Sequence, residues 1–255
     1  MLVASVDTAT LTLSCALLDL SPRGLRLLCD RTDRAPARPP PGGPAGGHGV
    51  RLPGALAELL AAEGRKVPDV EGYAVGLGPG SFTGLRIGLA TWKGLAYANR
   101  RPIAGASSLA AMALGALPAA PAGALLVPLL DARKGEVYAG FYRADAGGFT
   151  AVAPEAALSP GALGGRLAEL EPRREARLGF GEGLLAYREA LEGAVTPLED
   201  GPGTPSAEMV ARLVAGRLVE PYDASALFAL EPHYVRASEA EIKFPHGVPA
   251  KKNGA

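Results

Sequence analysis

The chain has 255 residues, and its 26 Lys and Arg residues balance 26 Asp and Glu residues. This balance gives a weak overall electrostatic field, which argues against the chain binding a nucleic-acid backbone by itself. Cys15 and Cys29 lack metal-type spacing, and no apolar run approaches the roughly 18 residues that span a bilayer. The N-terminal residues carry no signal-peptide pattern, so we expect a cytoplasmic protein that contacts no membrane.

The first half of the chain alternates apolar, β-prone runs with helical periodicity. The pattern predicts strands over 2–6, 11–18, 25–30, 72–78 and 103–106, and helices over 52–63 and 85–99. A run dense in Pro and Gly, 34–49, predicts a mobile loop before the first helix. The order of these elements is typical of a ribonuclease-H-like mixed sheet.

The second half partly repeats this order. It predicts strands over 125–131, 136–143, 149–152 and 176–180, and helices over 163–170 and 206–219. We therefore predict an α/β protein with the actin-like ATPase fold, in which two ribonuclease-H-like lobes enclose a cleft. The expected division is an N-terminal lobe over 1–106, a C-terminal lobe over 107–230 and a segment over 231–255. Its last residues, 244–255, predict a disordered tail.

The polar turn Asp7-Thr8-Ala9-Thr10 follows the first strand. A turn of exposed amides and hydroxyls can cradle phosphate, with Asp7 near a metal and Thr8 and Thr10 beside the anion. The same residues also suit an Asx-type turn, in which their side chains satisfy local backbone donors. The four residues favour the Asx-type turn, because Ala9 stands where a phosphate-binding turn usually has Gly.

The most distinctive motif is Gly78-Pro79-Gly80-Ser81-Phe82-Thr83-Gly84-Leu85-Arg86-Ile87-Gly88. It matches neither the dinucleotide-binding fingerprint nor a Walker A loop. Ser81 and Thr83 could bind an anion at the helix N-terminus or simply cap the helix. Gly88 and Gly94 each cost about 1 kcal/mol relative to Ala inside a helix. Close approach by another element would offset this cost, either from the helix at 52–63 or from another protein chain.

A second polar turn spans Asp131-Ala132-Arg133-Lys134-Gly135-Glu136-Val137-Tyr138. Asp131 could act as a metal ligand or base, but a hairpin with charge pairs is the favoured interpretation. The histidines His48, His233 and His246 stand in loop or tail contexts and form no HxxxH or HExxH pair. We predict no catalytic residue and no metal site.

Together, these motifs and the tail Pro232-His233-Tyr234-Val235-Arg236 resemble the bacterial TsaB family, also called YeaZ, over nearly the whole chain. The resemblance implies a role in forming N6-threonylcarbamoyladenosine at position 37 of tRNA. In that family the transferase TsaD carries the metal and the chemistry. TsaB is a scaffold that pairs with TsaD, and the ATPase TsaE joins the pair. Of the metal-binding HxxxH of TsaD, only His48 remains here.

The resemblance also implies site residues and partners. Asp7, Thr8 and Thr10 would be a remnant phosphate turn, and Asp131, Arg133, Glu136 and Tyr138 a second-lobe turn. We expect no intrinsic cofactor, with ATP or ADP only at the level of the complex. The expected partners are TsaD and TsaE, a second copy when the chain is isolated, and tRNA only indirectly. The implied partner interface comprises Leu56, Leu59, Gly80, Ser81, Phe82, Thr83, Gly84, Leu85, Arg86, Ile87, Gly88 and Thr91.

The alternative function is an actin-fold small-molecule kinase or ATPase that uses the interlobe cleft. It requires a Gly-Gly adenosine loop in the second lobe, where Gly147-Gly148 and Gly164-Gly165 lack a convincing context. Catalytic TsaD itself is disfavoured by the chain length and the incomplete histidine pair. We therefore expect a non-catalytic partner subunit.

Overall fold

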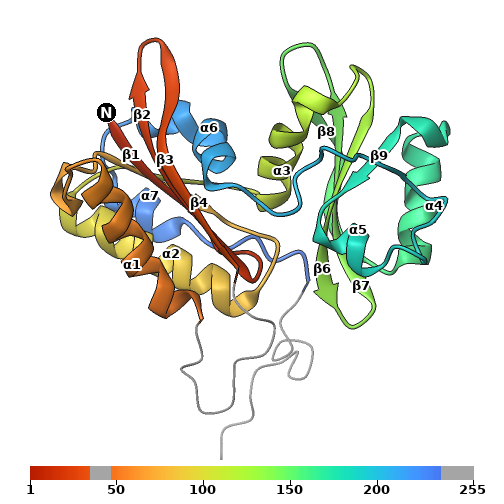
Figure 1. Cartoon of the computed structure of the whole chain (residues 1–255), viewed down its shortest axis with the longest axis horizontal. Coiled ribbons are helices and arrows are strands. Elements are labelled where there is room, and N and C mark those ends of the chain that lie inside the picture. Colours follow the sequence, from red (N-terminus) through yellow and green to blue (C-terminus); the bar gives the residue numbers. More distant parts are fainter. Residues whose placement is uncertain (35–46, 237–255) are drawn as a thin grey trace, which may run out of the picture.

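The computed structural model describes residues 1–34 and 47–236 and shows two lobes, each built on a five-stranded sheet (Figure 1). Most of the predicted Pro- and Gly-rich loop, residues 35–46, lies outside the described residues, as does the predicted tail. The predicted two-lobed α/β architecture is confirmed.

The first sheet has the strand order β3-β2-β1-β4-β5. β1 pairs antiparallel with β2 and parallel with β4, so that Val6 lies opposite both Cys15 and Val75. Every residue of β1 is buried because helices cover both faces of this sheet. The strands are β1 (Leu2–Asp7), β2 (Thr12–Ser21), β3 (Gly24–Arg34), β4 (Gly72–Gly76) and β5 (Ile103–Ala106).

Two long helices, α1 (His48–Ala62) and α2 (Phe82–Asn99), cover one face of the first sheet. Trp92 of α2 is fully buried there, and its indole N–H donates to the Ala4 carbonyl at 3.0 Å. The short helix α7 (Ala224–Ala229) packs beside α2. The predicted helices are confirmed, although α1 begins at His48 rather than at Leu52.

Helix α6 (Ala207–Leu218) covers the opposite face of the first sheet. Its apolar stripe of Val210, Val214 and Leu218 is buried against Val3 and other residues of this sheet. The sequence predicted that residues 107–230 form the C-terminal lobe. This prediction is wrong for residues 207–229, because α6 packs against the first sheet and buries its second face. α6 and α7 belong to the first lobe.

The second sheet has the order β10-β9-β6-β7-β8 and repeats the mixed topology of the first. α3 (Ser108–Ala116) covers one face and α4 (Pro160–Leu170) the other, while α5 (Glu182–Ala186) follows β9. The strands are β6 (Leu125–Arg133), β7 (Glu136–Ala144), β8 (Phe149–Leu158), β9 (Arg177–Phe180) and β10 (Thr196–Pro197). Short 3-10 helices lie at Val67–Asp69, Leu117–Ala119 and Arg174–Ala176.

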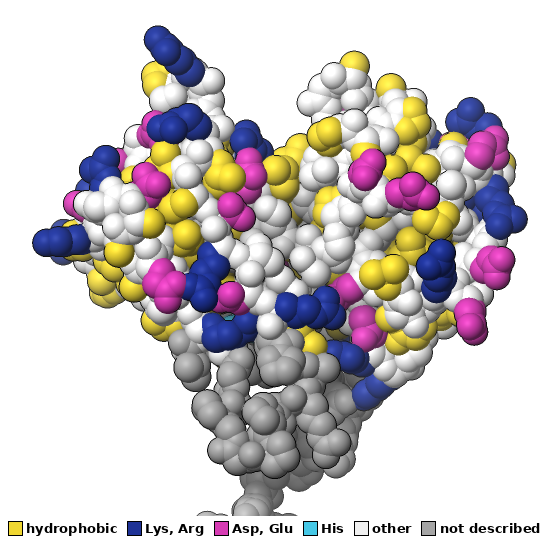
Figure 2. Space-filling model, in the orientation of Figure 1, with side chains coloured by type: hydrophobic (Ala, Val, Ile, Leu, Met, Phe, Trp, Pro, Cys, Tyr) yellow, Lys and Arg dark blue, Asp and Glu magenta, His cyan; other side chains and the backbone are white. Residues whose placement is uncertain are grey.

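Helix α3 lies where the lobes meet, because it packs on β6 and also contacts α6 of the first lobe. In Figure 2 a notch separates the two lobes, and acidic and basic side chains are spread over both without forming a patch of one sign. In the part of the chain that the structure describes, no helix has both the length and the apolarity to cross a membrane.

Candidate functional site

The turn Asp7–Thr10 is closed to solvent. None of its four residues is more than 5% exposed. The Asp7 carboxylate accepts the Ala9 N–H at 2.8 Å through Oδ1 and the Ser108 hydroxyl at 2.6 Å through Oδ2. Thr10 Oγ1 accepts the Thr12 N–H at 3.0 Å. These local bonds confirm the Asx-type interpretation, because the side chains of the turn satisfy its own backbone donors.

Three glycines on one edge of α2 and its leading loop close this turn. A Cβ atom at Gly80 would overlap the Ala9 carbonyl, and one at Gly84 would overlap the Thr8 carbonyl. A Cβ atom at Gly88 would overlap the Thr8 side chain. The predicted close approach at Gly88 is thus confirmed, but it comes from the β1–β2 turn rather than from α1 or another chain.

Burial also controls the charge of the turn. Desolvation raises the pKa of Asp7 to about 6, against the lowering effect of its hydrogen bonds from Ser108 and Ala9. The buried Thr8 hydroxyl makes no hydrogen bond within the described residues. An incoming phosphate would therefore meet a buried carboxyl group and packed backbone, and the unbonded Thr8 hydroxyl lies under Gly88.

His48 ties the start of α1 to the same turn and does not stand in a loop as the sequence suggested. Its Nε2 lies 2.7 Å from the Thr10 carbonyl, and its Nδ1 lies 3.2 Å from Arg51 Nη2. Burial lowers the pKa of His48, which favours a neutral ring with the proton on Nε2. Across residues 1–34 and 47–236, no group of three His, Cys, Asp or Glu side chains is placed to hold a metal ion.

A cavity of about 240 Å³ at the lobe junction brings the sequence motifs together. The first lobe contributes the β1–β2 turn and the start of α2, and the second lobe contributes the β6–β7 turn. Residues that line it include Thr10, Gly80, Ser81, Phe82, Asp131, Arg133, Tyr138, Glu182 and Arg236. Motifs separated by more than a hundred residues therefore share one site.

The β6–β7 turn has the predicted hairpin geometry. Arg133 and Gly135 have φ values of 63° and 81°, in the left-handed region that a tight turn requires. Asp131 accepts the Arg133 N–H at 2.8 Å and the Tyr187 hydroxyl at 3.1 Å. The Asp131 carboxylate thus stabilises the turn, which accounts for its place in the motif.

Glu182 is a cavity residue that sequence reasoning missed. Burial raises the pKa of Glu182, although Arg34 Nη2 lies 3.8 Å from its carboxylate. Glu182 follows β9 in the run Gly179-Phe180-Gly181-Glu182-Gly183, a strand-to-helix turn that could have signalled a site. The cavity contains Glu182 and Asp131 together with Arg133 and Arg236, so its charge selects no single class of ligand.

The outer face of α2 is the second candidate site. Phe82 and Tyr97 are 41% and 56% exposed, and Thr83, Arg86, Ala90 and Gly94 are also exposed along this helix. Nothing lies within 4 Å of a Cβ atom built at Gly94. No other part of the described chain packs closely on Gly94, whereas the Thr8 side chain packs on Gly88.

Leu56 and Leu59 do not belong to this outer face. They are only 4% and 6% exposed, because they pack into the core between α1 and the first sheet. Gly84, Leu85 and Gly88 are likewise buried, whereas Ile87 and Thr91 are partly exposed. The outer side of α1 carries small side chains instead, among them Gly54, Ala57 and Ala61.

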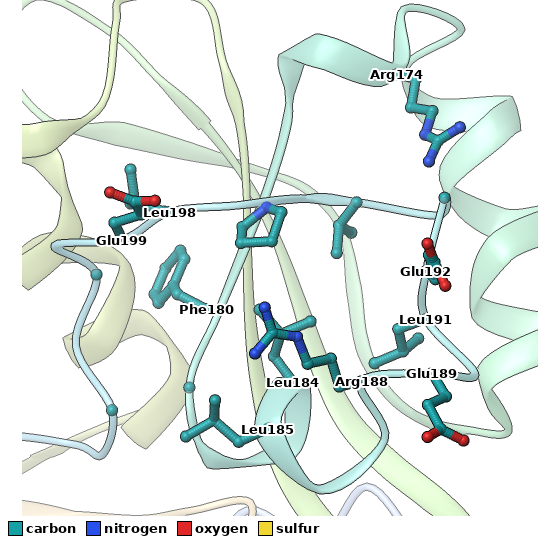
Figure 3. A pocket seen from close by; sticks show the side chains of 16 residues that line it. Arg174, Phe180, Leu184, Leu185, Arg188, Glu189, Leu191, Glu192, Leu198 and Glu199 are labelled. Carbon is teal, nitrogen blue, oxygen red and sulfur yellow. The ribbon is translucent and has the colours of Figure 1, made fainter.

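A pocket of about 600 Å³ lies in the second lobe beside β9, β10 and α5 and contains none of the predicted site residues (Figure 3). Phe180, Leu184 and Leu191 form its apolar side. Arg188, Glu189 and other charged side chains surround it. Because both signs of charge are present, charge selects no single class of ligand.

Two linked α/β lobes, with helices on both faces of each mixed sheet, define an actin-like two-lobed protein. The family model for TsaD, tRNA N6-adenosine threonylcarbamoyltransferase, matches residues 41–187. The Escherichia coli tRNA threonylcarbamoyladenosine biosynthesis protein TsaB is 32% identical over 200 residues, 78% of this chain and 84% of that protein. The chain belongs to the TsaB family, also called YeaZ.

Further relatives agree with this assignment. The Bacillus subtilis TsaB protein is 29% identical over 77% of this chain and 83% of its own length. A Pseudomonas aeruginosa crystal structure, described as similar to peptidase YeaZ, matches with a TM-score of 0.72 and 29% identity. The match covers 92% of this chain and 99% of that one. These relatives confirm the family resemblance that the motifs indicated.

Proposed function

We propose that this chain is a non-catalytic subunit in the biosynthesis of N6-threonylcarbamoyladenosine on tRNA, which binds and activates a TsaD-type transferase. Membership of the TsaB family supports the pathway. The closed Asp7–Thr10 turn supports the absence of catalysis by this chain, since an actin-like phosphotransferase needs that turn open to phosphate.

The outer faces of α1 and α2 are the proposed docking surface. Gly54 and Gly94 are exposed within these helices, and nothing within 4 Å occupies the space where their side chains would be. Each exposed glycine costs about 1 kcal/mol relative to Ala. A helix of a partner that approaches the backbone closely would compensate for this cost.

Charge and aromatic content indicate which partner surface would fit. α2 contains Arg86 and Lys93 but no acidic residue, and it exposes Phe82 and Tyr97. Aromatic and Arg side chains are enriched among residues that dominate binding energy. The matching partner face would be apolar with acidic residues around it, and we expect the isolated chain to bury the same face in a homodimer.

Binding would activate the transferase by favouring one arrangement of its lobes, which requires that this chain bind that arrangement more tightly than others. TsaE would join the assembled pair, and contact with tRNA would be indirect. Any ATP or ADP would belong to the complex. The division of the chain into lobes at residue 106 and a segment from 231 remains part of this proposal, with α6 and α7 reassigned as above.

The experiment is a modification assay with purified subunits, from which each is omitted in turn. We expect that omitting this chain abolishes modified tRNA, and that adding it raises transferase turnover without any turnover of its own. Modification at the full rate without this chain would refute the proposal.

The alternative, a small-molecule kinase or ATPase, predicts a different result. Isothermal titration of the isolated chain with ATP and Mg²⁺ should give no micromolar binding, because the interlobe cavity is only about 240 Å³ and the Asp7–Thr10 turn beside it is buried. Micromolar binding with release of phosphate would favour the kinase instead.

A further inference from the structure

The segment that follows α7 runs from the first lobe toward the second (Figure 1). The His233 N–H donates to the carbonyl of Leu77, just after β4, at 2.7 Å. This backbone bond fixes the segment to the first lobe directly beside the lobe junction. Residues 231–236, called the clasp below, contain the Pro-His-Tyr-Val-Arg motif, for which the proposed function gives no role.

The clasp also binds the start of α2. The ring of Tyr234 stacks on Phe82 with 5.4 Å between ring centroids. The Tyr234 hydroxyl accepts a hydrogen bond from Arg86 Nε at 3.1 Å. The Arg86 guanidinium in turn lies 3.8 Å from the centre of the Phe82 ring. These three side chains form one cluster at the first-lobe side of the junction.

On the second-lobe side the clasp contacts two carboxylates. Arg236 Nη1 lies 2.9 Å from the Glu136 carboxylate at the start of β7. His233 Nε2 lies 3.4 Å from Glu155 Oε2 on β8. Glu155 Oε2 is buried and makes no hydrogen bond in the described part of the chain, and the His233 ring is the clasp group that approaches it.

The other oxygen of Glu155 reaches the covalent connection between the lobes. It accepts hydrogen bonds from the hydroxyls of Ser107 and Tyr142. Ser107 lies between β5 of the first lobe and α3 at the junction. Glu155 therefore joins β8, the interlobe connection and the clasp in one polar group.

The topology explains why such a contact would matter. The described chain passes between the lobes at Ser107 and again between Gly203, which still bonds to Glu182, and Ala207, which bonds to Ser14. Two covalent connections leave a hinge about which two lobes can rotate. A third, non-covalent connection on another side of the junction restricts that rotation.

We propose that residues 231–236 act as a clasp that fixes the angle between the two lobes. Tyr234 and Arg86 connect the clasp to α2, so partner docking on the outer face of α2 is coupled to the lobe angle. This coupling rests on the proposed function, whereas the clasp itself does not.

The first experiment uses the isolated full chain and compares Tyr234→Ala with Tyr97→Ala. Tyr97 stacks on Phe228 at 5.7 Å, so this control also removes an exposed aromatic pair on α2, but one that lies within the first lobe. Hydrogen exchange of the clasp amides should accelerate at least about three-fold in Tyr234→Ala. The radius of gyration from solution scattering should increase, and Tyr97→Ala should change neither quantity.

Wild-type exchange and dimensions in Tyr234→Ala would overturn the clasp, as would equal changes in Tyr97→Ala. If Tyr234→Ala does not fold, Arg86→Gln and Glu155→Gln provide the same test from the two sides of the junction. Both should accelerate exchange of the clasp, and wild-type exchange in both would overturn it.

A second arm tests the coupling. Addition of the TsaD-type partner at saturation should slow exchange of the clasp amides, and unchanged exchange in a complex shown to form would refute the coupling. Failure of the complex to form would count against the proposed function alone, because the first experiment needs no partner.

Discussion

Gly88 of α2 lies directly over the side chain of Thr8, so closely that a Cβ atom at Gly88 would overlap the Thr8 hydroxyl. This relationship joins the two motifs that the sequence made most prominent. The glycines of α2 seal the β1–β2 turn on one side of the helix, while Gly94 stays open on another side. One helix thus closes the β1–β2 turn and also carries part of the proposed docking surface.

Substitution at these two glycines should therefore have opposite effects on stability. Gly88→Ala should destabilise the folded chain by about 1–3 kcal/mol, because its methyl group is forced against Thr8. Gly94→Ala should stabilise it by roughly 0.5–1 kcal/mol, because its methyl group meets open space in a helix. Urea unfolding followed by the fluorescence of Trp92 measures both changes, and equal effects would contradict the packing described.

The buried Asp7 carboxyl predicts a specific pH dependence. Its pKa of about 6 in the folded state exceeds the ordinary aspartate value of 3.8, so the folded chain binds one more proton than the unfolded chain between these pH values. Asp7 therefore contributes a stability that falls as pH rises from about 4 to about 6, by roughly 3 kcal/mol in total. Asp7→Asn should remove this slope, whereas Asp145→Asn on the exposed β7–β8 turn should retain it. Identical pH profiles of stability for Asp7→Asn and wild type would contradict the assignment.

Leu56 should behave as a core residue. Leu56→Ala should lower the free energy of unfolding by about 2–5 kcal/mol, because a buried side chain is removed from the first-lobe core. The control is Glu58, which lies two positions after Leu56 on α1, is exposed and pairs with Arg31 at the surface. Glu58→Ala should lower the free energy of unfolding by no more than about 1 kcal/mol. Thermal denaturation distinguishes the two, and a Leu56→Ala variant as stable as Glu58→Ala would place Leu56 at a surface.

The sequence predicted most elements because their periodicity reflects burial on one face. It missed α3, whose residues Leu109, Met112 and Ala116 are buried on all sides between the lobes. A helix that is apolar all round has no amphipathic period to recognise. The sequence also could not assign α6 to a lobe, because the stripe through Val210 and Val214 shows that a face is buried but not which sheet covers it.

The candidate site was predicted only in part, because sequence motifs show which residues are unusual but not which of them meet in space. The motifs around Asp7, Gly88 and Asp131 were recognised, and the structure brings their turns to one junction. Leu56 and Leu59 were assigned to a partner face because an apolar stripe on a helix fits either a partner or the chain's own sheet. Glu182 was missed because its only signal is the glycine-rich turn after β9, and such a turn more often marks a change of chain direction than a site.

The most direct test of the docking surface is the affinity of a TsaD-type partner for Gly94→Leu and for its matched control, Gly216→Leu. Both glycines are exposed within helices and have open space at the Cβ position, but Gly216 lies on α6, on the opposite face of the first sheet. We predict that Gly94→Leu weakens binding at least about ten-fold, roughly 1.4 kcal/mol, while Gly216→Leu binds as the wild type does. Wild-type affinity in a folded Gly94→Leu variant would contradict docking through α2.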